Sequence, residues 1–200
     1  MRRTVLTILL LIPAVWVFPT AGAAPVAASV PAVPGIAAAA SGLPDPRLTP
    51  GAVNPAVTQA NIQQTICVRG YTKTIRPPEQ YTEALKHRQL REYGYRDQRI
   101  WHYEEDHLVP LEVGGAPRDP RNLWPEPHYG KWDSYTKDAL ENELHWRVCH
   151  GRISLRAAQR VFETDWVAGY QKYVVDRHYR HYSHYRHGLS LHRHFRHWRR

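Results

Sequence analysis

The stretch from Tyr103 to Glu141 constrains this chain most, because it joins an apolar run, a turn, a short strand and a charged helix in one order. A carboxylate and a histidine, Asp106 and His107, stand beside the β-prone apolar residues of 108–113. A Gly-Gly pair at 114–115 and the proline-bounded segment that follows predict a turn. Asn122 then opens a second short strand, which the prolines at 125 and 127 are expected to stop. The pattern predicts an α+β domain.

Asp106 and His107 have the chemistry that hydrolysis of a phosphodiester requires. A histidine titrates near neutral pH, so His107 is the natural base to take a proton from water. Asp106 offers the hard oxygen ligands that divalent cations prefer. Adjacent strand residues face opposite sides, so both side chains reach one site only if the chain bends there. Glu104 shares a strand face with Asp106 and is expected either behind the metal site or on the surface.

This stretch resembles the HNH (ββα-metal) nucleases. The phrases Glu-Asp-His-Leu-Val-Pro-Leu-Glu-Val-Gly-Gly and Asn-Leu-Trp-Pro-Glu-Pro are typical of a group of exported bacterial HNH-like proteins. The resemblance implies a ββα-metal core with additional flanking helices and one divalent ion, which would be Mg, Mn, Ni or Zn. It further implies that His107 activates water, that Asn122 orients His107, and that Asp106 and a second group hold the ion. The second group is either Asp133 or His128.

The helix after the second strand carries Asp133, Lys137 and Glu141 at four-residue steps, so these side chains form one stripe. In related nonspecific nucleases an Asn and a Glu have the spacing that Asp133 and Glu141 have here, so Asp133 is a departure from that pattern. A carboxylate also binds hard cations. Asp133 is equally well placed to cap the helix at its start.

The chain has two cysteines, Cys67 and Cys149, and in an exported protein this number suggests one disulfide. Such a bond would close a loop of about eighty residues, and the loop-entropy model values this closure at roughly 4 kcal/mol. Two unpaired thiols are the alternative. Neither cysteine belongs to a CxxC pair, so no structural zinc is expected.

The two ends of the chain differ from its middle. Residues 1–23 combine Arg2-Arg3, an apolar run and a small-residue cleavage site, which predicts a secretory signal peptide; an uncleaved anchor is the alternative. Residues 24–53 are rich in Ala and Pro and are expected to form a flexible spacer. The domain itself is expected over residues 54–175. The predicted signal peptide indicates a secreted, periplasmic or cell-envelope protein. After cleavage it would have no stable membrane span.

Residues 176–200 consist mainly of His, Arg and Tyr, with seven His and seven Arg. A segment this polar cannot bury a core, so the sequence predicts a disordered basic tail. Of the 27 Lys and Arg in the chain, 18 lie between the first three residues and the tail, against 18 Asp and Glu. The domain is therefore close to neutral, and the tail, rather than the domain, is the part expected to bind polyanions or metal ions.

Two functions remain in view. The first is a secreted, metal-dependent HNH-type endonuclease that hydrolyses DNA or RNA. The second is a non-catalytic secreted binding protein that keeps the HNH-like fold as a scaffold and uses its tail to bind metal ions or polyanions. The enzyme would need Asp106 and His107, whereas the binding protein would need the tail.

Overall fold

The computed structural model describes residues 41–176. The predicted signal peptide, the spacer up to residue 40 and the tail from residue 177 lie outside the described residues. The described part mixes helices with one antiparallel sheet of two strands, β1 (Tyr103–His107) and β2 (Leu123–Pro127). Their register sets Glu104 opposite Glu126, Asp106 opposite Trp124 and His107 opposite Leu123.

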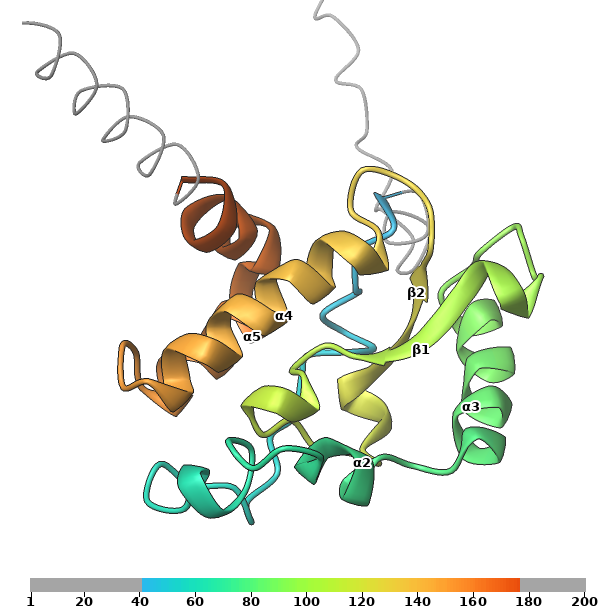
Figure 1. Cartoon of the computed structure of the whole chain (residues 1–200). Coiled ribbons are helices and arrows are strands. Elements are labelled where there is room, and N and C mark those ends of the chain that lie inside the picture. The colour runs from blue at the N-terminus through green and yellow to red at the C-terminus, as the bar shows by residue number, and fades with distance from the viewer. Residues whose placement is uncertain (1–40, 177–200) are drawn as a thin grey trace, which may run out of the picture. The chain divides into compact units, whose positions relative to one another are not determined.

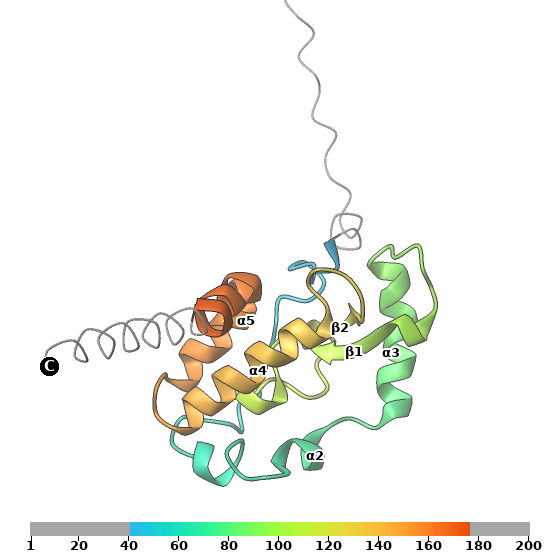
Figure 2. The ribbon, with the colours of Figure 1, turned by 45° about the horizontal axis from the view of Figure 1, so that its top comes forward.

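Helices flank this sheet on both sides (Figure 1). The helices of the described residues are α2 (Tyr71–Ile75), α3 (Glu79–Glu92), α4 (Ser134–Cys149) and α5 (Leu155–Tyr170), with short 3-10 turns η1 (Ile62–Gln64), η2 (Ile100–His102), η3 (Leu111–Val113) and η4 (Pro120–Asn122), and the π-helical turn η5 (Gln171–Val175). Helix α3 contacts both strands, and α4 packs against α5. Figure 2 shows α4 in front of the strands and α3 on the opposite side of them.

Side-chain caps begin the two long C-terminal helices, and the cap of α4 is the one that the sequence predicts. Asp133 caps α4, since its carboxylate accepts the Thr136 amide at 3.0 Å, and Ser154 caps α5 through the Ala157 amide at 3.2 Å. Leu140, Leu144 and Val148 are fully buried on one side of α4. This apolar stripe fixes which face of α4 turns toward the core.

After β1, residues 108–113 form a bend and the turn η3, which the bond from Gly115 N–H to Pro110 O at 2.9 Å closes. One local prediction about the strands is wrong. Pro125 and Pro127 do not stop β2 but lie within it. A two-stranded sheet has only edge strands, and an edge strand tolerates proline where its missing N–H would face away from the ladder.

The segment just before residue 54 packs on the domain, although the sequence predicts it as spacer. Thr49 is fully buried and donates to Leu123 O at 3.2 Å, and Gly51 N–H donates to Arg121 O at 2.9 Å. Val53 forms an isolated antiparallel bridge with Gly115. The packed part of the chain therefore begins before Asn54 and covers the start of β2.

Within residues 41–176, none of the helices combines the length and the apolar character that crossing a bilayer would require.

Candidate active site

Asp106 and His107 stand together at the end of β1, and their side chains have different surroundings. His107 is buried, and its Nε2 lies 3.0 Å from the carbonyl oxygen of Pro117. Burial lowers the pKa of His107, and the neighbouring Asp106 opposes this only in part. The imidazole is therefore neutral at neutral pH.

Lys137 lies at the centre of the site, although the sequence suggests only a place in a helix stripe. Its side chain is fully buried, and its ammonium donates to the Asp106 and Glu141 carboxylates and, at 2.9 Å, to the backbone carbonyl of His107. Lys137 precedes Leu140 by three residues and Leu144 by seven, so it belongs to the buried face of α4. That spacing is a signal from which the sequence could have placed Lys137 inside.

The ion pairs determine the charge of both partners. Burial alone would lower the pKa of Lys137, but Asp106 and Glu141 raise it well above the usual range. Burial alone would raise the pKa of Asp106, but the Lys137 ammonium holds it below the usual range. Lys137 is thus a permanent cation, and it ties α4 to the end of β1.

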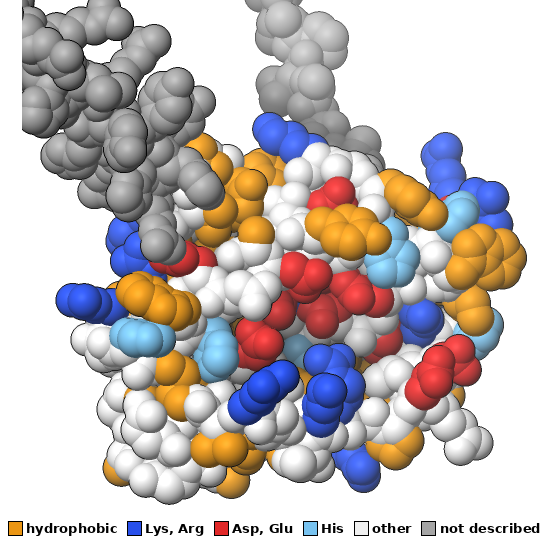
Figure 3. Space-filling view, in the orientation of Figure 1, with side chains coloured by type: hydrophobic (Ala, Val, Ile, Leu, Met, Phe, Trp, Pro, Cys, Tyr) orange, Lys and Arg blue, Asp and Glu red, His pale blue; other side chains and the backbone are white. Residues whose placement is uncertain are grey.

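We call the carboxylates around Lys137 the acidic cluster; they are Glu104, Asp106, Glu126, Asp138 and Glu141. Figure 3 shows Asp and Glu side chains gathered on one face, between the start of α4 and the sheet. Burial, and then the neighbouring Asp106 and Asp138, raise the pKa of Glu104 to about 7. The cluster holds more carboxylates than the single buried ammonium can neutralise.

Glu126 is a member of this cluster that the sequence analysis missed. It is 1% exposed, its Oε2 lies 3.9 Å from the Lys137 ammonium, and its Oε1 has no hydrogen-bond partner among the described residues. Burial raises its pKa well above the usual range. The sequence does not predict the burial of Glu126, because a Glu between two prolines is more typical of an exposed loop.

Among the described residues, the side-chain hydrogen bonds of Asn122 go to the backbone of the neighbouring segments and not to the imidazole of His107. Its side-chain oxygen accepts the amides of Val109 at 2.9 Å and Ala52 at 3.2 Å. Its side-chain amide donates to the carbonyls of Val109 at 3.0 Å and Ala116 at 3.1 Å. The side chain is thereby fully satisfied, and the loop that it closes leads directly into Pro117, the partner of His107.

The two alternatives for a second metal ligand have other contacts. The Asp133 carboxylate is engaged in capping α4, where it also accepts the Thr136 hydroxyl at 2.8 Å. His128 Nδ1 lies 3.1 Å from the Ser134 hydroxyl, which lies near Glu104 and opposes the rise in its pKa. Among the contacts of residues 41–176, neither Asp133 nor His128 bonds to Asp106, so His128 is linked to the acidic cluster only through Ser134.

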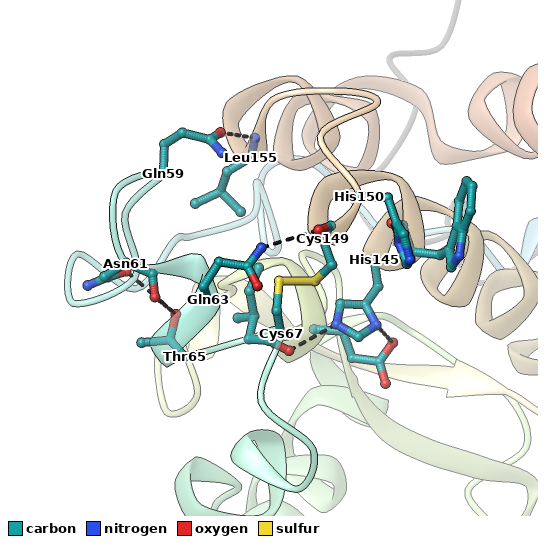
Figure 4. The surroundings of a disulfide bond; sticks show 12 residues. Gln59, Asn61, Gln63, Thr65, Cys67, His145, Cys149, His150 and Leu155 are labelled. Carbon is teal, nitrogen blue, oxygen red and sulfur yellow. Dashed lines mark hydrogen bonds and ion pairs between the residues drawn. A yellow bond between two sulfur atoms is a disulfide. The ribbon is translucent and has the colours of Figure 1, made fainter.

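The predicted disulfide is confirmed, since Cys67 and Cys149 are bonded to each other (Figure 4). The adjacent His145 brings three potential ligand atoms within 4.8 Å of one another, so this Cys-His-Cys group of the described residues could hold a metal ion. Thiolates, not disulfide sulfurs, are the strong ligands. The group would therefore need the disulfide to be reduced, and it lies apart from the acidic cluster, at the far end of α4.

Comparison of the chain with protein-family models, curated proteins and solved structures finds no match in any of the three. The assignment of a function therefore depends on the chemistry of the site.

Proposed function

We propose that the chain is an endonuclease of the HNH type, which hydrolyses phosphodiester bonds of nucleic acid with His107 as the base. The supporting observation is the contact of His107 Nε2 with the Pro117 carbonyl at 3.0 Å. A carbonyl oxygen can only accept, so Nε2 carries the ring proton and Nδ1 carries the lone pair. A neutral imidazole held in this tautomer is suited to take a proton from water.

Asn122 is a positioning residue in this proposal. Three of its four hydrogen bonds close the loop that precedes Pro117, and in the fourth its side-chain oxygen accepts the Ala52 amide. Gly115 allows the close approach within that loop, because a Cβ there would lie 1.7 Å from Val109 O and 3.0 Å from Asn122 Nδ2. The loop thus holds the Pro117 carbonyl, and the carbonyl holds the ring of His107.

The acidic cluster fits a hard divalent cation. The unpartnered Oε1 of Glu126 and the raised pKa of Glu104 both indicate that the cluster lacks positive charge. Asp106 and Glu104, which lie two residues apart on one strand face, would hold such an ion, and the ion would neutralise the charge that develops on the phosphate. The exposed Arg76, which acts electrostatically on His107 and Asp138, would attract the phosphate.

The non-catalytic alternative has one observation in its favour. The Lys137 ammonium already pairs with Asp106, the carboxylate that the HNH resemblance assigns to the metal. A buried lysine in this position can serve as the structural cation of a scaffold that binds its partners through the basic tail. The tail lies outside the described residues.

The test is cleavage of DNA and RNA by the full chain in the presence of Mg, Mn, Ni or Zn. We expect His107→Ala to lower the rate about a hundred- to ten-thousand-fold, which is typical of a lost general base. The matched control is His87→Ala, which removes an exposed histidine of α3. Melting curves must accompany the assay because His107 is buried.

Each outcome decides one point. If His107→Ala remains folded and cleaves as fast as the wild type, the base is wrongly assigned. If the wild type cleaves nothing with any of the four ions, the non-catalytic alternative replaces the proposal.

A further inference from the structure

A row of aromatic side chains borders the acidic cluster on the protein surface. We call Trp101, His102, Tyr129, His128 and Tyr135, in this spatial order, the aromatic track. Trp101 is 67% exposed, Tyr129 63% and Tyr135 71%, which makes them three of the six large hydrophobic residues that are exposed in the described part. Figure 3 shows hydrophobic and histidine side chains along the edge of the acidic group. Such a concentration of exposed rings indicates a binding surface.

The rings of the track follow one another at nearly regular steps. The centroid distances are 6.0 Å from Trp101 to His102, 5.2 Å from His102 to Tyr129, 6.5 Å from Tyr129 to His128 and 6.5 Å from His128 to Tyr135. Three separate elements supply them, namely η2, the loop after β2 and the first turn of α4. A continuous surface of ring faces and edges therefore arises from residues that are distant in the sequence.

Hydrogen bonds hold the track in place. His102 Nδ1 bonds to the Asp97 carboxylate, and the His102 carbonyl accepts the His128 amide at 2.9 Å. His128 is fixed in turn by the Ser134 hydroxyl at 3.1 Å. Rings that are already positioned lose little conformational entropy when a ligand stacks on them.

The surroundings of the track suit a ligand with flat rings and a negative backbone. Arg99 and Lys131 are exposed beside it; Arg99 acts electrostatically on Tyr129, and Lys131 lies 4.9 Å from the centre of the Trp132 ring. A hollow of about 370 Å³ opens next to Tyr129, with Tyr95, Tyr103 and Trp132 in its wall. Cations beside stacked aromatic rings are the usual means of binding single-stranded nucleic acid.

The track also leads to the proposed catalytic site. His128 bonds to Ser134, and the Ser134 hydroxyl lies near enough to Glu104 of the acidic cluster to oppose the rise in its pKa. A strand that stacks its bases on the track would therefore bring its backbone to the edge of the site that carries Asp106 and His107.

We propose that the aromatic track binds unpaired nucleotides by stacking, so that single-stranded nucleic acid is the substrate class of this site. This inference rests on the proposed nuclease function and specifies its substrate. Base faces are accessible in a single strand, whereas in a duplex they are covered by the neighbouring base pairs. The surface therefore favours a single strand over a duplex.

The test is binding of a fluorescent single-stranded oligonucleotide and of the matching duplex to the full chain carrying His107→Ala, so that cleavage does not interfere. We expect Trp101→Ala, Tyr129→Ala and Tyr135→Ala each to weaken single-strand binding about 5- to 150-fold, which corresponds to 1–3 kcal/mol per stacked base. Tyr129→Phe should bind like the parent because it keeps the ring. All proteins carry the same basic tail, so its nonspecific binding cancels in the comparison.

The control variant is Trp146→Ala, which removes another exposed tryptophan that also stacks on a histidine, His150, at 4.4 Å but lies outside the track. It should leave binding unchanged.

The inference is overturned if the track variants bind the single strand as tightly as the parent, if none of the proteins binds it, or if the duplex binds equally well. It is also overturned if the variants alter self-association in sedimentation instead, because the surface would then join two copies. Track-dependent binding by a wild type that cleaves nothing would refute the nuclease and keep the single-strand site.

Discussion

Two neighbouring carboxylates of β1, Asp106 and Glu105, are partly buried on opposite faces of the sheet, and their pKa values are shifted in opposite directions. Asp106 faces α4, where the Lys137 ammonium holds its pKa below the usual range. Glu105 faces α3, and burial raises its pKa to about 9 even though Lys86 and Arg88 oppose the shift. Both Glu105 oxygens lack a hydrogen-bond partner among the described residues. Burial is common to both residues, so a directly bonded cation makes the difference.

The largest change in the free energy of unfolding is expected when the Lys137 ammonium, the cation bonded to Asp106, is removed. Lys137→Met leaves Asp106 and Glu141 buried without their shared ammonium, and loss of one partner of a buried ion pair typically costs about 3–5 kcal/mol. We expect this loss in urea unfolding at pH 7 with a chelator present. Lys73→Met, which alters an exposed lysine of α2, should change the free energy of unfolding by less than about 0.5 kcal/mol. Equal stability of the two variants would contradict the central role of Lys137.

A smaller loss is expected for Asp106→Asn, which keeps the shape of the side chain and leaves Lys137 its bonds to Glu141 and His107. We expect a cost of about 1–3 kcal/mol at pH 7. The folded pKa of Asp106 lies below the unfolded value of about 3.8, so its contribution is present above that pH and is lost as the pH falls through the folded pKa. The gap between wild type and variant should therefore shrink below pH 4.

Asp138→Asn is the matched comparison for this experiment. Burial and the neighbouring Asp106 raise the pKa of Asp138, so removing its charge should not destabilise the protein at pH 7. A loss as large as that of Asp106→Asn would mean that the acidic cluster is not short of positive charge.

The smallest effect is expected on the other face, from Glu105→Gln. The folded pKa of about 9 exceeds the unfolded value of 4.5, so stability is present below pH 4.5 and is lost as the pH rises through 9. The variant should therefore have a flatter profile of unfolding free energy between these values, and at pH 8 it should be at least about 1 kcal/mol more stable than the wild type, because folding of the wild type then requires Glu105 to take up a proton.

The charges that act on Glu105 are those of Lys86, Arg88 and Glu92 of α3 and, from the opposite face of the strand, that of Asp106. Chemical denaturation from pH 5 to 9, with a chelator present, measures the two profiles. Identical profiles for wild type and Glu105→Gln would show that Glu105 ionises freely in the folded protein.

The sequence allowed the positions of the site along the chain to be predicted better than their environments. Asp106 and His107 end a strand and Asp133 begins a helix, because caps and alternating strands are local patterns. The burial of Lys137 could have been predicted from its spacing to Leu140 and Leu144. The burial of Glu126 could not, because it depends on the register of β2 against β1 and on the approach of α4.

The aromatic track was beyond the reach of sequence patterns for a similar reason. Trp101, Tyr129 and Tyr135 have no common period, and their proximity arises from the bond between the His128 amide and the His102 carbonyl. Contacts between loops follow from the tertiary arrangement and leave no repeat in the chain.

The bond between Cys67 and Cys149 makes a covalent ring of the segment that carries α3, both strands and α4. A protease that nicks this ring, for example at the exposed residues 129–131, opens the chain without releasing a fragment. The two pieces remain one molecule, with His107 on one piece and Lys137 on the other. Such a ring therefore allows the site to survive a cut that would divide a linear chain into two separate pieces.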